Sequence, residues 1–65
     1  MNLVILGGGE SGVGAAILGK KLGYEVFLSD KGKLLESYRA SLLEQGVEFE
    51  EGQHTPERIF KADLI

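Results

Sequence analysis

Three glycines with the spacing Gly-x-Gly-x-x-Gly directly follow a short apolar run near the start of the chain. They are Gly7, Gly9 and Gly12, and the apolar run covers residues 3–6. In a turn from a strand into a helix, the first glycine permits a tight bend, the second lets backbone approach a ligand, and the third allows close helix packing. The helix start supplies unpaired N–H groups and a positive dipole end. The turn is therefore predicted to bind a phosphate or pyrophosphate.

An acidic residue, Asp30, ends the second apolar run, residues 24–30, about 20 residues after the glycines. A carboxylate at this place can accept hydrogen bonds from a ribose hydroxyl or from the N–H of a base. It can instead cap the next turn of the chain. Because the carboxyl ends of parallel strands meet at one sheet edge, we expect Asp30 and the glycine turn to face one crevice.

Three more polar residues flank this predicted site. Glu10 would repel a phosphate unless its side chain turns outward, although its N–H can still donate and an acidic residue suits a helix start. The Ser11 hydroxyl can cap the helix or bind a phosphate oxygen. Lys31 can approach the base side of the crevice or remain solvated. The unpaired N–H groups of the glycine turn and the helix start are thus the predicted anion ligands.

No other group of residues in the chain has a recognisable chemistry. His54 is the only histidine and there is no cysteine, so neither a metal site nor a catalytic dyad is predicted. No Walker A loop, nucleophile elbow or Ser-His-Asp set is present. Catalytic chemistry is therefore expected to lie outside this segment.

Apolar runs alternate with helically spaced apolar residues in the order β-α-β-α-β-α-β. We expect strands at 3–6, 25–29 and 47–50, helices at 12–22, 33–45 and 56–61, and a fourth strand beginning at 64–65. The predicted fold is a truncated, Rossmann-like, three-layer α/β/α arrangement with a parallel sheet. The third strand should lie nearer the sheet edge, because its apolar residues alternate with acidic ones.

Local signals mark the ends of these elements. Gly23 and Gly46 lie where left-handed helix caps are needed. Thr55 before a proline indicates a helix start, with the threonine hydroxyl capping a free N–H. Glu50 and Glu51 are expected to be a solvated strand end.

Length and charge limit the classes of function. A chain of 65 residues buries only about 60% of its unfolded surface and has room for part of a doubly wound sheet, so residues 1–65 are expected to be the N-terminal piece of a longer enzyme. The net charge is −3 and no basic stripe is present, which argues against nucleic acid as a partner. The first apolar run is too short for a membrane span or signal peptide, so cytoplasmic residence is expected.

The chain resembles the N-terminus of the MurD family of Mur ligases over essentially all of its length. The likeness rests on residues 4–16, on Ser29-Asp30-Lys31, and on residues 51–55 with the sequence Glu-Gly-Gln-His-Thr. Its most specific part is the string Gly-Glu-Ser-Gly-Val-Gly-Ala-Ala. It implies a three-domain cytoplasmic enzyme of peptidoglycan synthesis, and hence of cell-wall biogenesis, cell shape and cell division, which joins D-glutamate to UDP-N-acetylmuramoyl-L-alanine with ATP and Mg²⁺ through an acyl phosphate.

The resemblance also implies roles for this segment. It would be the UDP-binding domain, with the N–H groups of Gly9, Glu10, Ser11 and Gly12 on the diphosphate and Asp30 on the uracil side. Some members carry threonine and arginine where this chain has Lys31 and Gly32, a departure that affects the uracil contacts. The ATP and Mg²⁺ sites would lie beyond the last residue, so the segment is expected to be inactive, to bind no cofactor and to be a monomer whose partners are its substrate and the rest of its own chain.

Two other classes share part of the pattern. An FAD- or NAD-binding fragment of an oxidoreductase has the same glycine turn and acidic residue, although such chains seldom continue with a Gly-x-His-Thr loop and an early fourth strand. A regulatory domain that senses a nucleotide would bind NAD or ATP and dimerise. Ligand preference and self-association distinguish the three classes.

Overall fold

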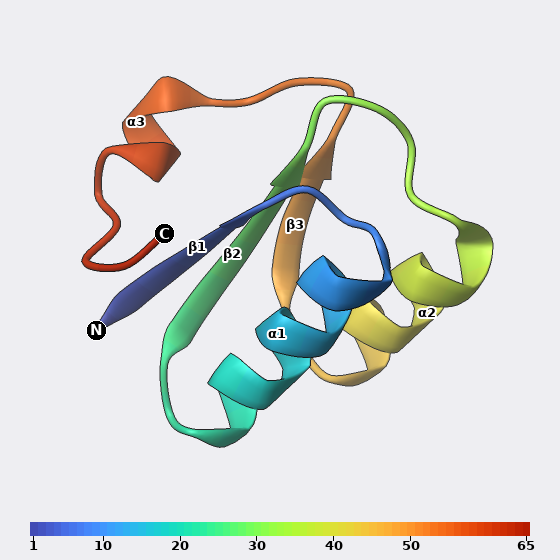
Figure 1. The fold of residues 1–65 in the computed structure, drawn as a ribbon, viewed down its shortest axis with the longest axis horizontal. Coiled ribbons are helices and arrows are strands. Elements are labelled where there is room, and N and C mark those ends of the chain that lie inside the picture. Colours follow the sequence, from blue (N-terminus) through green and yellow to red (C-terminus); the bar gives the residue numbers. More distant parts are fainter.

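Strands and helices alternate along the chain, and the computed structural model describes all residues, 1–65. The elements are β1 (Asn2–Leu6), α1 (Glu10–Lys21), β2 (Glu25–Asp30), α2 (Glu36–Glu44), β3 (Glu48–Glu51) and α3 (Pro56–Ile59). The strands form a parallel sheet in the order β1-β2-β3 (Figure 1). The predicted α/β fold and the edge position of the third strand are therefore confirmed.

A fourth stretch of backbone pairs with the free side of β1. Leu64 forms a parallel bridge with Leu3, and the Val4 N–H donates to the Leu64 carbonyl oxygen at 2.9 Å. The spatial order is thus β3-β2-β1 followed by residue 64, so the direction in which strands are added reverses at β1. Open α/β sheets bind ligands at the carboxyl ends of the strands where this order reverses, which is the point where the glycine turn leaves β1.

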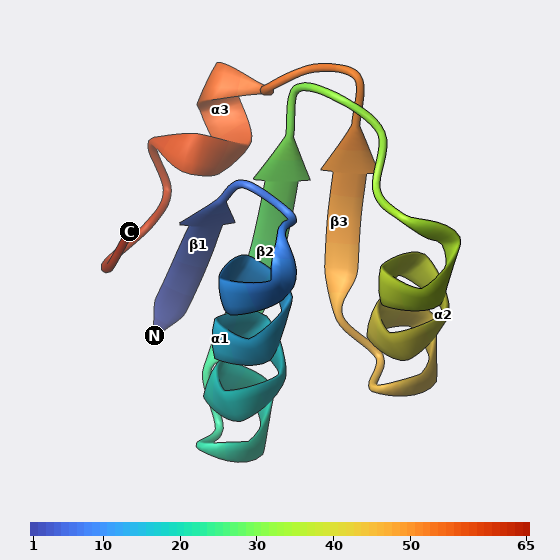
Figure 2. The same ribbon diagram turned by 45° about the vertical axis from the view of Figure 1, so that its right-hand side comes forward.

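Helices lie on both faces of the sheet, as Figures 1 and 2 show: α1 and α2 cover one face, and α3 lies over the other. On the face of α3, the Arg58 guanidinium lies 4.0 Å from the centroid of the buried Phe27 ring. Side chains of successive strand residues alternate between the faces, so Val26 and Leu28 point toward α1 and α2. The three-layer arrangement is the one expected.

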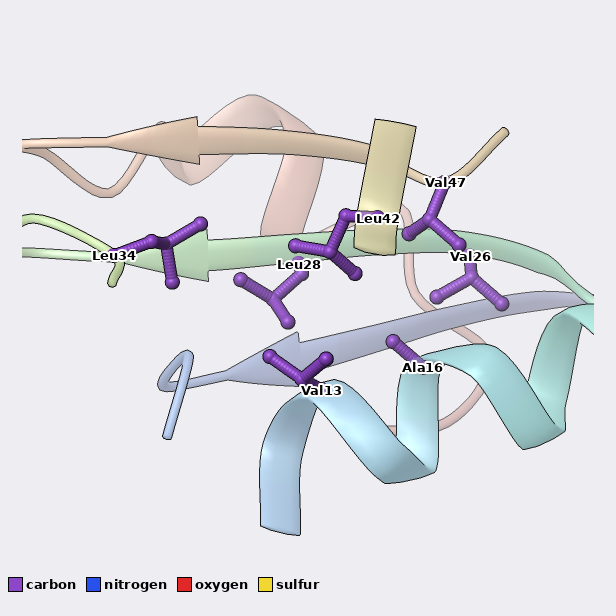
Figure 3. Packing of buried hydrophobic residues seen from close by; sticks show 7 residues of the cluster. All are labelled: Val13, Ala16, Val26, Leu28, Leu34, Leu42 and Val47. Carbon is purple, nitrogen blue, oxygen red and sulfur yellow. The ribbon is translucent and has the colours of Figure 1, made fainter. Parts of the chain in front are cut away.

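The core lies between the sheet and the helices α1 and α2 (Figure 3). It consists of aliphatic side chains that are nearly or fully buried: Val13, Ala16, Val26, Leu28, Leu34, Leu42 and Val47. Small residues bring α1 close to the sheet, and a Cβ added at Gly19 would lie only 2.6 Å from a methyl carbon of Leu3. The position of α1, and of the glycine turn that begins it, is thus set by close packing.

The ends of the helices differ from the expected ones for local reasons. The first helix begins earlier, at Glu10, because Gly9 takes the extended conformation of an N-cap. The second begins later, at Glu36, because Leu34 is drawn into the core. Thr55 is the N-cap of α3, but its hydroxyl makes no capping bond and donates to Glu50 Oε1 at 2.6 Å, so the predicted capping role was wrong.

Candidate functional site

The glycine turn has the geometry that its spacing predicts. Gly7 has a φ of 103°, which L side chains rarely adopt, and its N–H donates to the Ser29 carbonyl oxygen at 2.8 Å. A Cβ added at Gly12 would collide with the Gly7 carbonyl oxygen and would approach the Ile5 side chain. The predicted roles of Gly7 in the tight bend and of Gly12 in close helix packing are therefore confirmed.

The N–H groups of residues 9–12 donate to no protein atom. They lie between the Gly8 N–H, which donates to Asp30, and the Val13 N–H, which donates to the Gly9 carbonyl oxygen at 2.9 Å. A Cβ at Gly9 would meet nothing within 4 Å, so the space beside these groups is open. The structure thus presents a row of free donors at the start of α1, where the helix dipole favours an anion.

Glu10 and Ser11 lie in the first turn of α1, and both are exposed. The helix has no side-chain cap, so the capping role considered for the Ser11 hydroxyl was wrong. Glu10 makes no hydrogen bond to the turn, and a carboxylate at this position stabilises a helix by about 0.3–1 kcal/mol. The N–H groups of both residues remain available to a ligand.

Asp30 joins the glycine turn to the end of β2. Its Oδ2 accepts the Gly8 N–H at 2.6 Å, and its Oδ1 accepts the Gly32 N–H at 2.8 Å. The interpretation of Asp30 as the cap of the next turn is confirmed, and the carboxylate also braces the glycine turn. Lys31 follows at the same sheet edge, exposed and without a side-chain hydrogen bond or ion pair. The expected closeness of Asp30 to the glycine turn is therefore confirmed.

A buried polar cluster that was not predicted from the sequence lies under the β3–α3 loop. The fully buried Ser29 Oγ lies 2.8 Å from Glu50 Oε2 and 2.6 Å from His54 Nδ1. Glu50 also accepts the Thr55 N–H at 2.8 Å. A hydroxyl has one proton, so when Ser29 donates to Glu50 it accepts from the N–H of His54 Nδ1, in the tautomer that carries hydrogen there. The cluster fastens residues 53–55 to the carboxyl ends of β2 and β3.

The side chain of the next residue, Glu51, makes its hydrogen bonds on the opposite face of the sheet. Its Oε2 accepts the Leu34 N–H at 2.7 Å and the Arg39 Nη2 at 3.0 Å, while its Oε1 lies 3.2 Å from Arg39 Nε. The prediction that Glu50 and Glu51 form a solvated strand end was therefore wrong: both carboxylates are hydrogen-bonded and partly buried. The one available signal was the run of two acidic residues directly before the Gly-x-His-Thr loop.

These contacts change the acidity of the two carboxyls. Burial raises the pKa of Glu50, but hydrogen bonds from Thr55 and Ser29 and the charge of His54 outweigh it, so the pKa is lowered. The hydrogen bond from Arg39, followed by the Leu34 N–H, lowers the pKa of Glu51. Both groups therefore favour the charged form in the folded protein.

Acid is expected to destabilise the fold through these groups. A folded-state pKa below the ordinary value of 4.5 means that the carboxylates stabilise the fold above that pH and lose this contribution as the pH falls through the lower, folded-state value. The free energy of unfolding, measured in urea from pH 7 to pH 3, should fall less steeply with decreasing pH in Glu50→Gln and Glu51→Gln than in the unaltered chain. Glu44→Gln, at an exposed position without a hydrogen bond, is the control. A profile for Glu50→Gln that is as steep as that of the control would contradict the prediction.

The predicted anion site is a surface turn and not a pocket. The larger hollow, about 670 Å³, lies between β3 and α3 and is lined by Phe27, Thr55 and Arg58 among others, away from residues 9–12. No group of three or more acidic or histidine side chains is placed to hold a metal ion. None of the helices has the length and apolarity needed to cross a membrane.

Comparison with known proteins identifies the family. The family model described as the MurD N-terminal domain matches residues 2–65. UDP-N-acetylmuramoylalanine--D-glutamate ligases are similar over 63 residues, 97% of this chain: that of Christiangramia forsetii is 56% identical, that of Cytophaga hutchinsonii 51% and that of Bacteroides thetaiotaomicron 48%. The chain spans 14% of the length of these relatives. No solved structure matches it. With the glycine turn, the acidic end of β2 and the sheet order described above, the match shows that this chain belongs to the MurD N-terminal domain family.

Proposed function

We propose that this chain is the UDP-binding domain of a ligase that adds D-glutamate to UDP-N-acetylmuramoyl-L-alanine in peptidoglycan synthesis. The relatives carry the name of this ligase, and they match nearly the whole chain. The observation that carries the proposal is the row of free N–H groups at residues 9–12, beside an open space at the start of α1. ATP and Mg²⁺ would bind elsewhere in the cytoplasmic, monomeric enzyme, which would supply the catalytic groups.

The diphosphate of UDP would lie over the start of α1. Its oxygens would accept the N–H groups of Gly9, Glu10, Ser11 and Gly12, and the dipole of α1 would add to these charge-assisted hydrogen bonds. Because the Glu10 side chain is exposed and the space beside Gly9 is open, Glu10 can contribute its N–H without placing its carboxylate over the turn. No basic side chain is needed for this mode of binding.

The uridine would lie toward Asp30 and Lys31. Each Asp30 oxygen accepts one backbone N–H and keeps lone pairs for a further donor, such as a ribose hydroxyl or the N–H of a base. The Lys31 N–H donates to no protein atom. An acceptor beside a free donor matches the edge of uracil, where an N–H lies next to a carbonyl oxygen.

Amide NMR titration of the chain with UDP, NAD and FAD in parallel tests this proposal, because dispersed spectra report folding and shift changes report binding. We expect selective shifts with UDP at residues 9–12 and at Asp30. Selective binding of NAD or FAD would instead favour an oxidoreductase fragment. Dimerisation with NAD or ATP would favour a regulatory module.

The variant Gly9→Val separates binding from folding within the same titration. The extended backbone at Gly9 and the open space beside it accommodate a valine, but the side chain would cover the free N–H groups. We expect the dispersed spectrum to persist and the affinity for UDP to fall by about tenfold or more, the equivalent of one or two charge-assisted hydrogen bonds. Gly14→Ala, also in open space but past the first turn of α1, should bind UDP normally. Unchanged affinity in Gly9→Val would overturn the placement of the diphosphate.

A further inference from the structure

The loop between β2 and α2, residues 31–35, is held in place by three hydrogen bonds to its backbone groups. The Gly32 N–H donates to Asp30, the Gly32 carbonyl oxygen accepts the Gly52 N–H at 3.0 Å, and the Leu34 N–H donates to Glu51 at 2.7 Å. Two of these bonds tie the loop to the end of β3. The position of the loop that follows Asp30 therefore depends on the neighbouring strand.

Glu51 is the one side chain from that strand in this set of bonds. It lies directly across the ladder from Asp30. Arg39 of α2 donates to both carboxylate oxygens of Glu51. The Glu51 side chain is 21% exposed and that of Arg39 is 28% exposed. This two-point contact fixes the carboxylate in one orientation and compensates its charge, so that two neighbouring acidic groups can share one sheet edge.

Leu34 packs against the glycine turn, but other contacts hold the backbone of that turn. Its side chain is 6% exposed and packs so closely over Gly8 that a Cβ at Gly8 would collide with it. The Gly8 N–H is held separately by Asp30. Loss of the Glu51 contact would therefore free the loop first and leave the backbone of the turn in place.

We infer that Glu51 is a positioning residue for nucleotide recognition: it holds the loop that presents the Lys31 N–H to the base and that orients the Asp30 carboxylate through the Gly32 N–H. The Glu51 carboxylate accepts hydrogen bonds from the Leu34 N–H and from Arg39, so Glu51 acts through the loop and not by contact with the ligand. This inference rests on the proposed function, because it assigns Glu51 to the uridine half of that site. It predicts that Glu51 contributes to the affinity for UDP and hardly to that for pyrophosphate.

The test compares the dissociation constants of UDP and pyrophosphate in the unaltered chain and in variants. In Glu51→Gln we expect UDP to bind about tenfold more weakly and pyrophosphate within about twofold of its original affinity, as for one lost charge-assisted contact. Arg39→Lys keeps the charge but loses the two-point contact, and should give a smaller loss in the same direction. Glu48→Gln is the matched control. Glu48 lies on the same strand as Glu51, and its exposed ion pair with Arg58 of α3 involves neither the glycine turn nor residues 31–35.

The outcomes separate the two proposals. If the unaltered chain binds no UDP, the proposed function fails and this inference fails with it. If it binds UDP but Glu51→Gln loses UDP and pyrophosphate equally, or loses neither, only the inference is overturned. Amide spectra show whether each variant is folded. If Glu51→Gln does not fold, Arg39→Lys tests the inference instead: equal losses of UDP and pyrophosphate affinity in that variant, or no loss of either, would overturn it.

Discussion

Gly12→Ala is expected to destabilise the fold by about 1–3 kcal/mol or more, the usual cost of forcing an extra carbon into a packed site. The added Cβ would meet the Gly7 carbonyl oxygen, which belongs to backbone and cannot rotate away. Gly7 is itself held at a φ of 103° by the turn and by its bond to the Ser29 carbonyl oxygen. The start of α1 would have to move outward. Urea unfolding followed by circular dichroism measures the loss, a large part of the stability of so small a domain.

Gly14→Ala is the matched control for this change. Gly14 lies in the same helix, is exposed and has nothing within 4 Å of the position of a Cβ. Alanine there should stabilise the fold by up to about 1 kcal/mol through its higher helix propensity. The two substitutions are chemically identical, so the difference between them isolates the collision with the turn. Equal stabilities would show that α1 does not pack on the Gly7 carbonyl as described.

The sequence predicts the glycine turn and its surroundings well because each part is encoded locally. Gly7 supplies a positive φ, Gly12 supplies close approach, and both requirements exclude a Cβ whatever the rest of the chain does. The meeting of Asp30 with this turn follows from topology, since parallel strands end at one edge. The alternation of apolar runs and helical spacing likewise predicts the order of elements, and Leu64, where a fourth strand is expected to begin, forms a parallel bridge with Leu3 of β1.

The contacts of the two acidic residues at the end of β3 could not be predicted in the same way. Glu50 meets Ser29, and Glu51 meets Arg39 and Leu34, all from other parts of the chain. An acidic strand end is usually solvated, and only the packing of loops over the sheet edge makes these carboxylates acceptors. The Thr55 hydroxyl is likewise engaged by Glu50: it donates to that carboxylate, and its oxygen accepts no N–H at the start of α3.

The hydrogen-bonded carboxylates on the two faces of the sheet edge have different consequences for a ligand. Ser29 and Glu50 together fix residues 53–55 on the face of α3, away from the free N–H groups of residues 9–12. Glu51 and Asp30 act on the face of α1 and α2, where the glycine turn lies. Changes at Glu50 should therefore affect stability more than binding, whereas those at Asp30 should affect both.

Asp30→Ala is expected to weaken both the fold and the anion site. It leaves the buried Gly8 N–H and the Gly32 N–H without their acceptor, and a hydrogen bond to a charged group contributes about 1.5–3 kcal/mol. The free energy of unfolding should fall by about 2 kcal/mol or more. Because the glycine turn loses its brace, pyrophosphate should bind more weakly as well as UDP, with the larger loss for UDP. Isothermal calorimetry with both ligands, beside urea unfolding, measures each effect.

Two further variants identify the cause. Asp30→Asn keeps one acceptor oxygen and can serve Gly8 or Gly32 but not both, so it should fall between the original chain and Asp30→Ala. Asp63→Ala removes the carboxylate that accepts the Asn2 N–H at 2.7 Å, far from the turn, and should lower stability while leaving UDP affinity unchanged. If Asp30→Ala lost UDP and kept both its stability and its pyrophosphate affinity, the carboxylate would act on the nucleoside alone. The bond to Gly8 would then not be what holds the glycine turn open to an anion.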